Sequence, residues 1–109
     1  MEELKPFTVR LESDKDRQHL FGDSPKTAGF RAGHVLLNPG EAVGEHSTKN
    51  KEEVIIIFEG TAEVSFDKLP SCAAGKNSIT YIPPQTTHNV KNIGKRSLKY
   101  IYIVCPTNQ

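Results

Sequence analysis

The sequence has 109 residues and a formal net charge of +1, with 14 basic and 13 acidic side chains spread along the chain. This length suits one domain with a single modest core. The balanced charge argues against a nucleic acid or an anionic membrane as the partner. The first residues, MEELKPF, hold no apolar run like that of a signal peptide, and no run approaches the ~20 residues that span a bilayer. We therefore expect a cytoplasmic protein.

Short stretches that suit β-strands recur along the chain, and turn residues separate them. Residues 7–11 alternate in polarity and predict a first strand. The polar residues 13–29 predict a long loop with one helical turn around residues 14–20. Further strands are predicted at residues 30–37, 53–59, 62–66, 78–82, 89–92 and 98–104. Residues 67–76 are expected to form a loop. No helix of any length is predicted, so the pattern is that of a β-sandwich or β-barrel.

Two of these stretches are apolar on both faces, at residues 54–58 and 100–105. An antiparallel strand with one face in water should alternate, so both strands must be covered on both sides. The chain has no predicted helix to supply that cover, and we expect a second copy of the chain to supply it in a homodimer. The alternative is that the amino-terminal strand and the long loop fold over these strands.

Two cysteines, Cys72 and Cys105, stand far apart in the sequence and belong to no C-x-x-C pair. This spacing is not that of a disulfide framework or a zinc finger. We expect both to be ordinary thiols that pack as small apolar side chains.

Two histidines and one glutamate stand at junctions between predicted strands and loops. His46 lies in a loop after a Pro-Gly turn, Glu53 opens an apolar strand, and His88 follows a Pro-Pro turn. Alternation puts Glu53 on the face of Ile55 and Ile57, where a carboxylate needs a proton, a cationic side chain or a metal to neutralise it. Two neutral imidazoles and one carboxylate bind Fe(II) in oxygenases and zinc in some hydrolases. Strands that fold back antiparallel would let these three residues form such a site.

The stretch Gly40-x5-His46-x-Thr48-x4-Glu53-x6-Gly60 resembles the first motif of the cupin superfamily. That motif normally holds a second histidine where this chain has Thr48. The spacing to Gly60 selects Glu53 rather than its neighbour as the glutamate of the motif. Residues 40–60 are therefore identified as motif one.

The stretch Asn77-x5-Pro83-x-Gln85-x2-His88-x3-Asn92 is similar to the second cupin motif, so residues 77–92 are identified as motif two. That motif prefers glycine where this chain has Asn77 and Gln85. Asparagine visits left-handed backbone conformations more readily than most residues, whereas Gln85 is expected to alter the turn before His88. Asn92 is expected to be a structural hydrogen-bonding residue.

The resemblance implies an all-β fold, an antiparallel β-barrel or double-stranded β-helix of the jelly-roll type, in a single domain over residues 1–109. It assigns His46, Glu53 and His88 as metal ligands. The fourth ligand position falls on Thr48, a poor ligand that is a candidate contact for bound water or substrate. The implied cofactor is one divalent metal ion per chain, and the same ligands accept Fe, Mn, Ni, Zn or Co.

The superfamily includes dioxygenases, isomerases and decarboxylases, so the first hypothesis is a metal-dependent enzyme that acts on a small polar molecule at the barrel mouth. The second is a cupin that captures a small ligand, sugar-like or carboxylate-bearing, with weak or no metal and no chemistry. A third, a purely structural or interaction protein, gives no reason for Glu53 to stand at the head of an apolar strand. No residue stands out as a separate general acid or base, so no catalytic residue is assigned.

The remaining histidines and the tyrosines carry weaker signals. His34 lies on a predicted strand and could face the cavity, but the favoured interpretation is a satisfied or exposed strand histidine. His19 is assigned no role. Alternation along the last strand puts Tyr100 and Tyr102 on one face and Ile101 on the other. Which of these faces looks inward stays open at this point.

Overall fold

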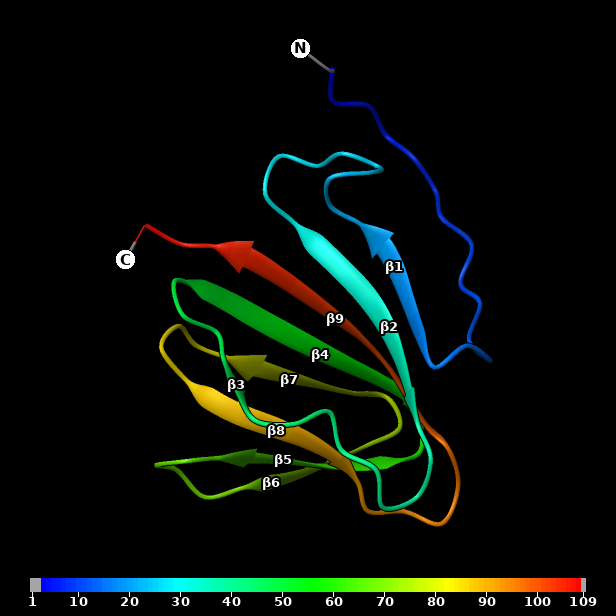
Figure 1. The fold of residues 1–109 in the computed structure, drawn as a ribbon, viewed down its shortest axis with the longest axis vertical. Coiled ribbons are helices and arrows are strands. Elements are labelled where there is room, and N and C mark those ends of the chain that lie inside the picture. The colour runs from blue at the N-terminus through cyan, green and yellow to red at the C-terminus, as the bar shows by residue number, and fades with distance from the viewer. Residues whose placement is uncertain (1–2, 109) are drawn as a thin grey trace.

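The chain folds into short antiparallel strands, as Figure 1 shows for the computed structural model, which describes residues 3–108. The strands are β1 (Arg17–Phe21), β2 (Arg31–Leu37), β3 (His46–Ser47), β4 (Lys51–Glu59), β5 (Thr61–Phe66), β6 (Cys72–Gly75), β7 (Ser78–Ile82), β8 (Thr87–Asn92) and β9 (Leu98–Pro106). No helix in the described range is long and apolar enough to span a membrane. Neither cysteine forms a disulfide.

The strands form two sheets that face one another. The first sheet has the order β1-β2-β9-β4-β7 and the second has the order β3-β8-β5-β6. Within residues 3–108 no ladder joins one sheet to the other, so the fold is a two-sheet jelly roll rather than a closed barrel. The predicted fold class, an antiparallel double-stranded β-helix, is confirmed.

The core lies between the two sheets and follows from side-chain alternation along each strand. On β4, every second side chain from Glu53 to Ile57 is buried, so the predicted shared face of Glu53, Ile55 and Ile57 is confirmed. The apolar core consists of Val35, Leu37, Ile55, Ile57, Ala62, Val64, Ala74, Ile82, Val90, Leu98 and Tyr100. Glu53 is therefore the polar end of an apolar row, at the rim of the core.

The predicted strand at residues 7–11 is wrong. Residues 7–11 form no ladder with the described part of the chain, and the side chain of Gln18 binds the backbone at the carboxyl end of this segment. Its Oε1 accepts a hydrogen bond from the Glu12 N–H at 2.7 Å, and its Nε2 donates to the Arg10 carbonyl at 2.9 Å. The segment therefore runs beside the edge of the first sheet without joining it (Figure 1).

Two further differences concern strands at sheet edges. β1 lies where a polar loop with a helical turn was predicted, and it pairs with β2 at the edge of the first sheet. β6 lies inside the predicted loop at residues 67–76 and pairs with β5 at the edge of the second sheet. An edge strand is half exposed and can consist of polar or small residues, so its sequence carries little hydrophobic periodicity.

The outer face of the first sheet is covered in part by the amino-terminal segment. The Lys99 ammonium on this face lies 3.5 Å from the Ser13 hydroxyl and 3.3 Å from an Asp14 carboxylate oxygen. Farther along the same sheet, Ile79 and Tyr81 on β7 are 69% and 55% exposed. The proposed cover by amino-terminal residues is thus present over only part of the face. The structure describes one chain, and the homodimer stays a prediction.

Left-handed backbone conformations occur at the glycine positions of both cupin motifs. Gly60 has φ = 88°, and a Cβ atom there would lie 2.6 Å from the Ser97 carbonyl oxygen. Asn77 and Gln85 stand where the second motif prefers glycine, and they too are left-handed, with φ = 70° and φ = 56°. The Gln85 N–H donates to the Lys49 carbonyl at 2.8 Å, which fastens the loop before β8 to the loop before β4. Asn77 and Gln85 thus both adopt the left-handed conformation that glycine takes most readily.

Candidate metal centre

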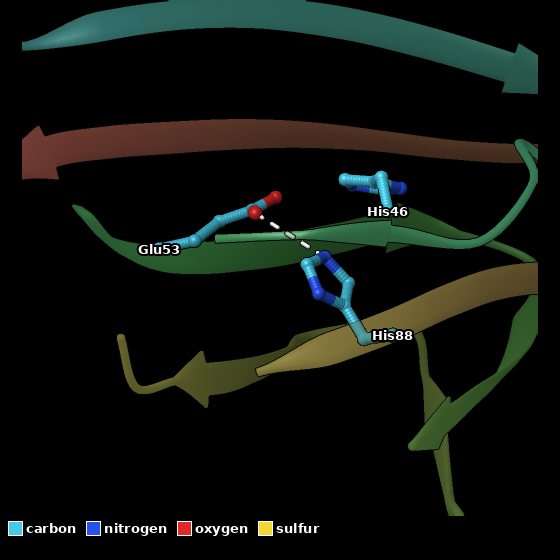
Figure 2. Close-up of side chains that lie close together, drawn as sticks. All are labelled: His46, Glu53 and His88. Atoms are coloured by element: carbon cyan, nitrogen blue, oxygen red, sulfur yellow. Dashed lines mark ion pairs between the residues drawn. The ribbon is translucent and has the colours of Figure 1, made fainter. Parts of the chain in front are cut away.

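Three side chains from three strands meet between the sheets (Figure 2). His46 on β3 and His88 on β8 are direct cross-strand partners in the second sheet, and their ring centroids are 4.2 Å apart. Glu53 reaches them from β4 in the facing sheet. One potential ligand atom of each residue lies within 4.8 Å of the other two. The fold therefore brings together the three residues that the sequence singled out.

Hydrogen bonds to the backbone fix the tautomer of both imidazoles. Nδ1 of His88 lies 3.1 Å from the Thr86 carbonyl oxygen, and Nδ1 of His46 lies 2.9 Å from the Gly44 carbonyl oxygen. A carbonyl oxygen only accepts, so each Nδ1 must carry the proton and donate it. The lone pair of each neutral ring is then on Nε2. Metal-binding histidines are commonly oriented by such a bond from the other ring nitrogen.

The Nε2 atom of His88 is buried and has no hydrogen-bond partner among residues 3–108. It lies 3.3 Å from Oε1 of Glu53, which is within ion-pair distance, but the two groups are not aligned as a hydrogen bond. A lone pair facing a carboxylate is repulsive unless a cation stands between them. The cation can be a proton or a metal ion, and the geometry suits either. The buried nitrogen therefore fits a divalent metal that His46, Glu53 and His88 would hold together.

The pKa of His88 also depends on the Glu53 carboxylate that it faces. Burial by itself lowers this pKa, because a charged ring loses its hydration. The Glu53 carboxylate and the Thr86 carbonyl outweigh burial, and together they raise the pKa of His88 above its usual value. The site thus attracts positive charge despite being 1% and 8% exposed at His88 and Glu53.

Thr48 is buried beside this site, and its hydroxyl is already engaged. The Oγ1–H donates to the Pro83 carbonyl at 2.7 Å, and Oγ1 accepts from the Thr86 N–H at 3.1 Å. These bonds tie the loop after β3 to the loop that leads into His88. The structure gives Thr48 a bracing role that sequence analysis missed, and its contact with a water or substrate stays a prediction.

A cavity of about 420 Å³ is lined by two of the three residues, His46 and Glu53. Tyr100 and Tyr102 line it, which settles the question that alternation left open, since these tyrosines face inward. Burial raises the pKa of Tyr100, so its phenol stays protonated at neutral pH. Arg17 and Lys51 also line the cavity. Sequence analysis missed Arg17, because it assigned that residue to a loop.

The other two histidines lie outside the site. His34 is fully buried on the outer side of the first sheet, where its ring centroid lies 5.5 Å from that of Phe58. Neither of its ring nitrogens has a hydrogen-bond partner in the described part of the chain, so the predicted satisfied or exposed histidine is wrong at this position. Burial, followed by the charge of Lys99, lowers its pKa. His19 is exposed and its Nε2 lies 3.1 Å from the Ser24 carbonyl oxygen.

Comparisons with solved structures agree on the fold. A cupin family protein of the double-stranded β-helix type from Methanocaldococcus jannaschii superposes with a TM-score of 0.79, at 18% identity over 95% of this chain and 94% of the other. A Cupin 2 conserved barrel domain protein from Salinispora arenicola superposes with a TM-score of 0.73, at 23% identity over 98% and 91%. At these identities the likeness concerns the fold alone.

Sequence comparisons identify the family. The alginate biosynthesis protein AlgA of Pseudomonas putida is 31% identical over 74 residues, which are 68% of this chain and 15% of that protein. AlgA of Pseudomonas fluorescens matches to the same extent. The chain thus spans only about 15% of the length of these curated relatives. The family profile described as Cupin domain matches residues 33–104. The chain therefore belongs to the cupin domain family.

Proposed function

We propose that this chain is a metal-binding cupin that acts on a small polar molecule in the cavity beside His46, Glu53 and His88. The proposal rests on the buried Nε2 atom of His88, which faces a buried carboxylate and has no hydrogen-bond partner within the described residues. One divalent cation per chain would satisfy both groups. Fe, Mn, Ni, Zn and Co all suit two imidazoles and a carboxylate, so the metal is left open.

A bound cation would polarise an oxygen atom of the substrate as a Lewis acid or support redox chemistry with dioxygen. The chain itself supplies a partly enclosed cavity and two phenol groups, those of Tyr100 and Tyr102, that face it. A dioxygenase, isomerase or decarboxylase reaction is compatible with such a site.

A second candidate function is capture of a small ligand without turnover. The observation in its favour is Thr48, which replaces the second histidine of motif one and whose hydroxyl hydrogen is taken by the Pro83 carbonyl. A weaker metal site would then serve to hold a ligand. Oxygen consumption and substrate turnover, measured with the metal-loaded protein, separate this binding protein from an enzyme.

The metal site is tested by elemental analysis of protein purified without a metal-affinity tag and reconstituted with each candidate cation. The matched variants are His88→Ala and His19→Ala, since both remove one imidazole and only the first lies in the site. We expect near-stoichiometric metal in the native chain and in His19→Ala, and loss of metal in His88→Ala. A folded native chain that takes up none of the five metals would overturn the proposal.

A further inference from the structure

We propose that the ligand of this cavity carries an oxyanion group, a carboxylate or a phosphate, and that Arg17 binds this group. The inference rests on the proposed function, because it names the class of molecule that the same cavity takes. It begins with the position of Arg17 on β1, directly opposite Val35 on β2. Val35 belongs to the core, so Arg17 lies on the inner face of the sheet, where it lines the cavity.

The guanidinium of Arg17 has no partner in the described part of the chain, where it makes neither a hydrogen bond nor an ion pair. Two other cations of the first sheet are engaged: Arg31 pairs with Asp23, and Lys99 lies within 3.4 Å of carboxylate oxygens of Asp14 and Glu59. Lys51 on β4 also lines the cavity and supplies a second positive charge there. Arg17 is exposed on its edge strand and lines the cavity, so the five donors of its planar fork are in contact with solvent and accessible to a ligand. A carboxylate or phosphate matches this fork with two parallel hydrogen bonds.

The charges on the cavity wall favour an anion. Arg17 and Lys51 supply two positive charges, and Glu45 and Glu53 supply two negative ones. Without a metal, these charges balance. A divalent cation held by the site would leave an excess of two positive charges, which favours a negatively charged ligand over a neutral one such as a sugar.

Two phenol hydroxyls complete the binding surface. Tyr102 lies across Gly33, and a Cβ atom added at Gly33 would be 2.6 Å from Cζ of the tyrosine ring. The missing side chain therefore makes room for Tyr102 on the cavity wall. Tyr100 stays protonated at neutral pH because burial raises its pKa, so it can donate a hydrogen bond to an anion. The cavity volume, about 420 Å³, is in the range of small-molecule sites.

The test is calorimetric titration of the full chain with malonate, with inorganic phosphate and with malonamide, the uncharged counterpart of malonate. The chain is studied metal-free and loaded with Zn²⁺, and zinc content is measured on each sample. The variants are Arg17→Gln and Arg17→Lys. The matched control is Arg96→Gln, which removes an equal charge from an exposed arginine that does not line the cavity.

We expect malonate or phosphate to bind the native chain and malonamide to bind far more weakly. Arg17→Gln should weaken anion binding at least tenfold, as loss of a charge-assisted hydrogen bond does. Arg17→Lys should restore part of the loss, and Arg96→Gln should bind as the native chain does. Tighter binding of malonate identifies a carboxylate, and tighter binding of phosphate identifies a phosphate.

The inference is overturned if the zinc-loaded chain binds neither anion, if malonamide binds as tightly as malonate, or if Arg17→Gln binds anions like the native chain. Its failure is distinct from failure of the metal site, because zinc content is measured separately. A chain that holds zinc but binds anions independently of Arg17 keeps the proposed function and loses the inference. A chain that binds anions through Arg17 but takes up no metal keeps the inference and loses the proposed function.

Discussion

Replacement of Thr48 by valine tests how the metal centre is supported. Valine keeps the shape of the side chain and removes its hydroxyl, which is 2.7 Å from the Pro83 carbonyl oxygen and 3.1 Å from the Thr86 nitrogen. Thr48 itself is 6% exposed, so water replaces the lost partners poorly. We expect Thr48→Val to lower the free energy of unfolding by about 1–3 kcal/mol, the cost of leaving partly buried backbone groups without partners.

The same change should loosen the candidate metal site. The carbonyl of Thr86 accepts the Nδ1–H of His88, so a shift of this loop misorients the imidazole. Loss of a group that orients a metal ligand typically weakens metal binding by about 10–100-fold. Thr48→Ser keeps the hydroxyl and is the matched control, expected to retain most of the stability and the metal affinity.

The assays are urea denaturation of the metal-free chain and metal titration of the folded chain. The reasoning is refuted if Thr48→Val unfolds within 0.5 kcal/mol of the native chain, about the scatter expected of an ordinary surface substitution. Unchanged stability together with weaker ligand or metal binding would instead support the direct contact with water or substrate that the sequence suggested for Thr48.

Four further predictions concern other parts of the molecule. Gly33→Ala should force the Tyr102 ring off the cavity wall and lower stability by about 1–3 kcal/mol, as overpacking does; thermal denaturation checks this. Asn92→Ala should lower stability by about 2–4 kcal/mol in urea, since the buried amide makes three hydrogen bonds to backbone groups; a loss under 1 kcal/mol would contradict it. His34 has a pKa below its usual 6.5 in the folded chain, so the unfolded chain binds its proton first as the pH falls below 6.5. The native chain should therefore lose more stability than His34→Leu between pH 8 and pH 5, and an equal loss would contradict the burial argument. Ile79→Lys should dissociate the predicted homodimer in sedimentation experiments, and a native chain that sediments as a monomer would exclude that dimer.

The sequence predicted the three residues of the candidate metal site because their spacing combines two regular features. Glu53 opens a strand whose alternation with Ile55 and Ile57 settles the face on which it lies, and that face is buried. His46 and His88 each stand in a cupin motif, and the family resemblance predicts antiparallel pairing of their strands. The pairing of His46 with His88 in register agrees with that expectation. Local periodicity and motif spacing were sufficient to predict these three residues, because the folded chain keeps the alternation of the strand and the pairing of the motifs.

The edge strands and the cavity wall were not predictable in the same way. β1 has the burial pattern of a half-exposed edge and no apolar period, so the sequence predicted a loop, and Arg17 was overlooked. The segment before it alternates like a strand, yet the Gln18 side chain binds its backbone. A contact between residues six or eight positions apart cannot be inferred from alternation. Whether such a contact forms depends on where the sheet ends in the folded chain.

The sequence by itself determined the all-β class, the two cupin motifs and the three residues that converge, since each depends on patterns within one short stretch. Tertiary structure alone decided that Tyr100 and Tyr102 face the cavity, that His34 is buried on the opposite side, and that Arg17 lies on the cavity wall. Alternation divides a strand into two faces but does not say which of them meets the other sheet. That choice is made by the packing of the sheets, through contacts between residues far apart in the chain.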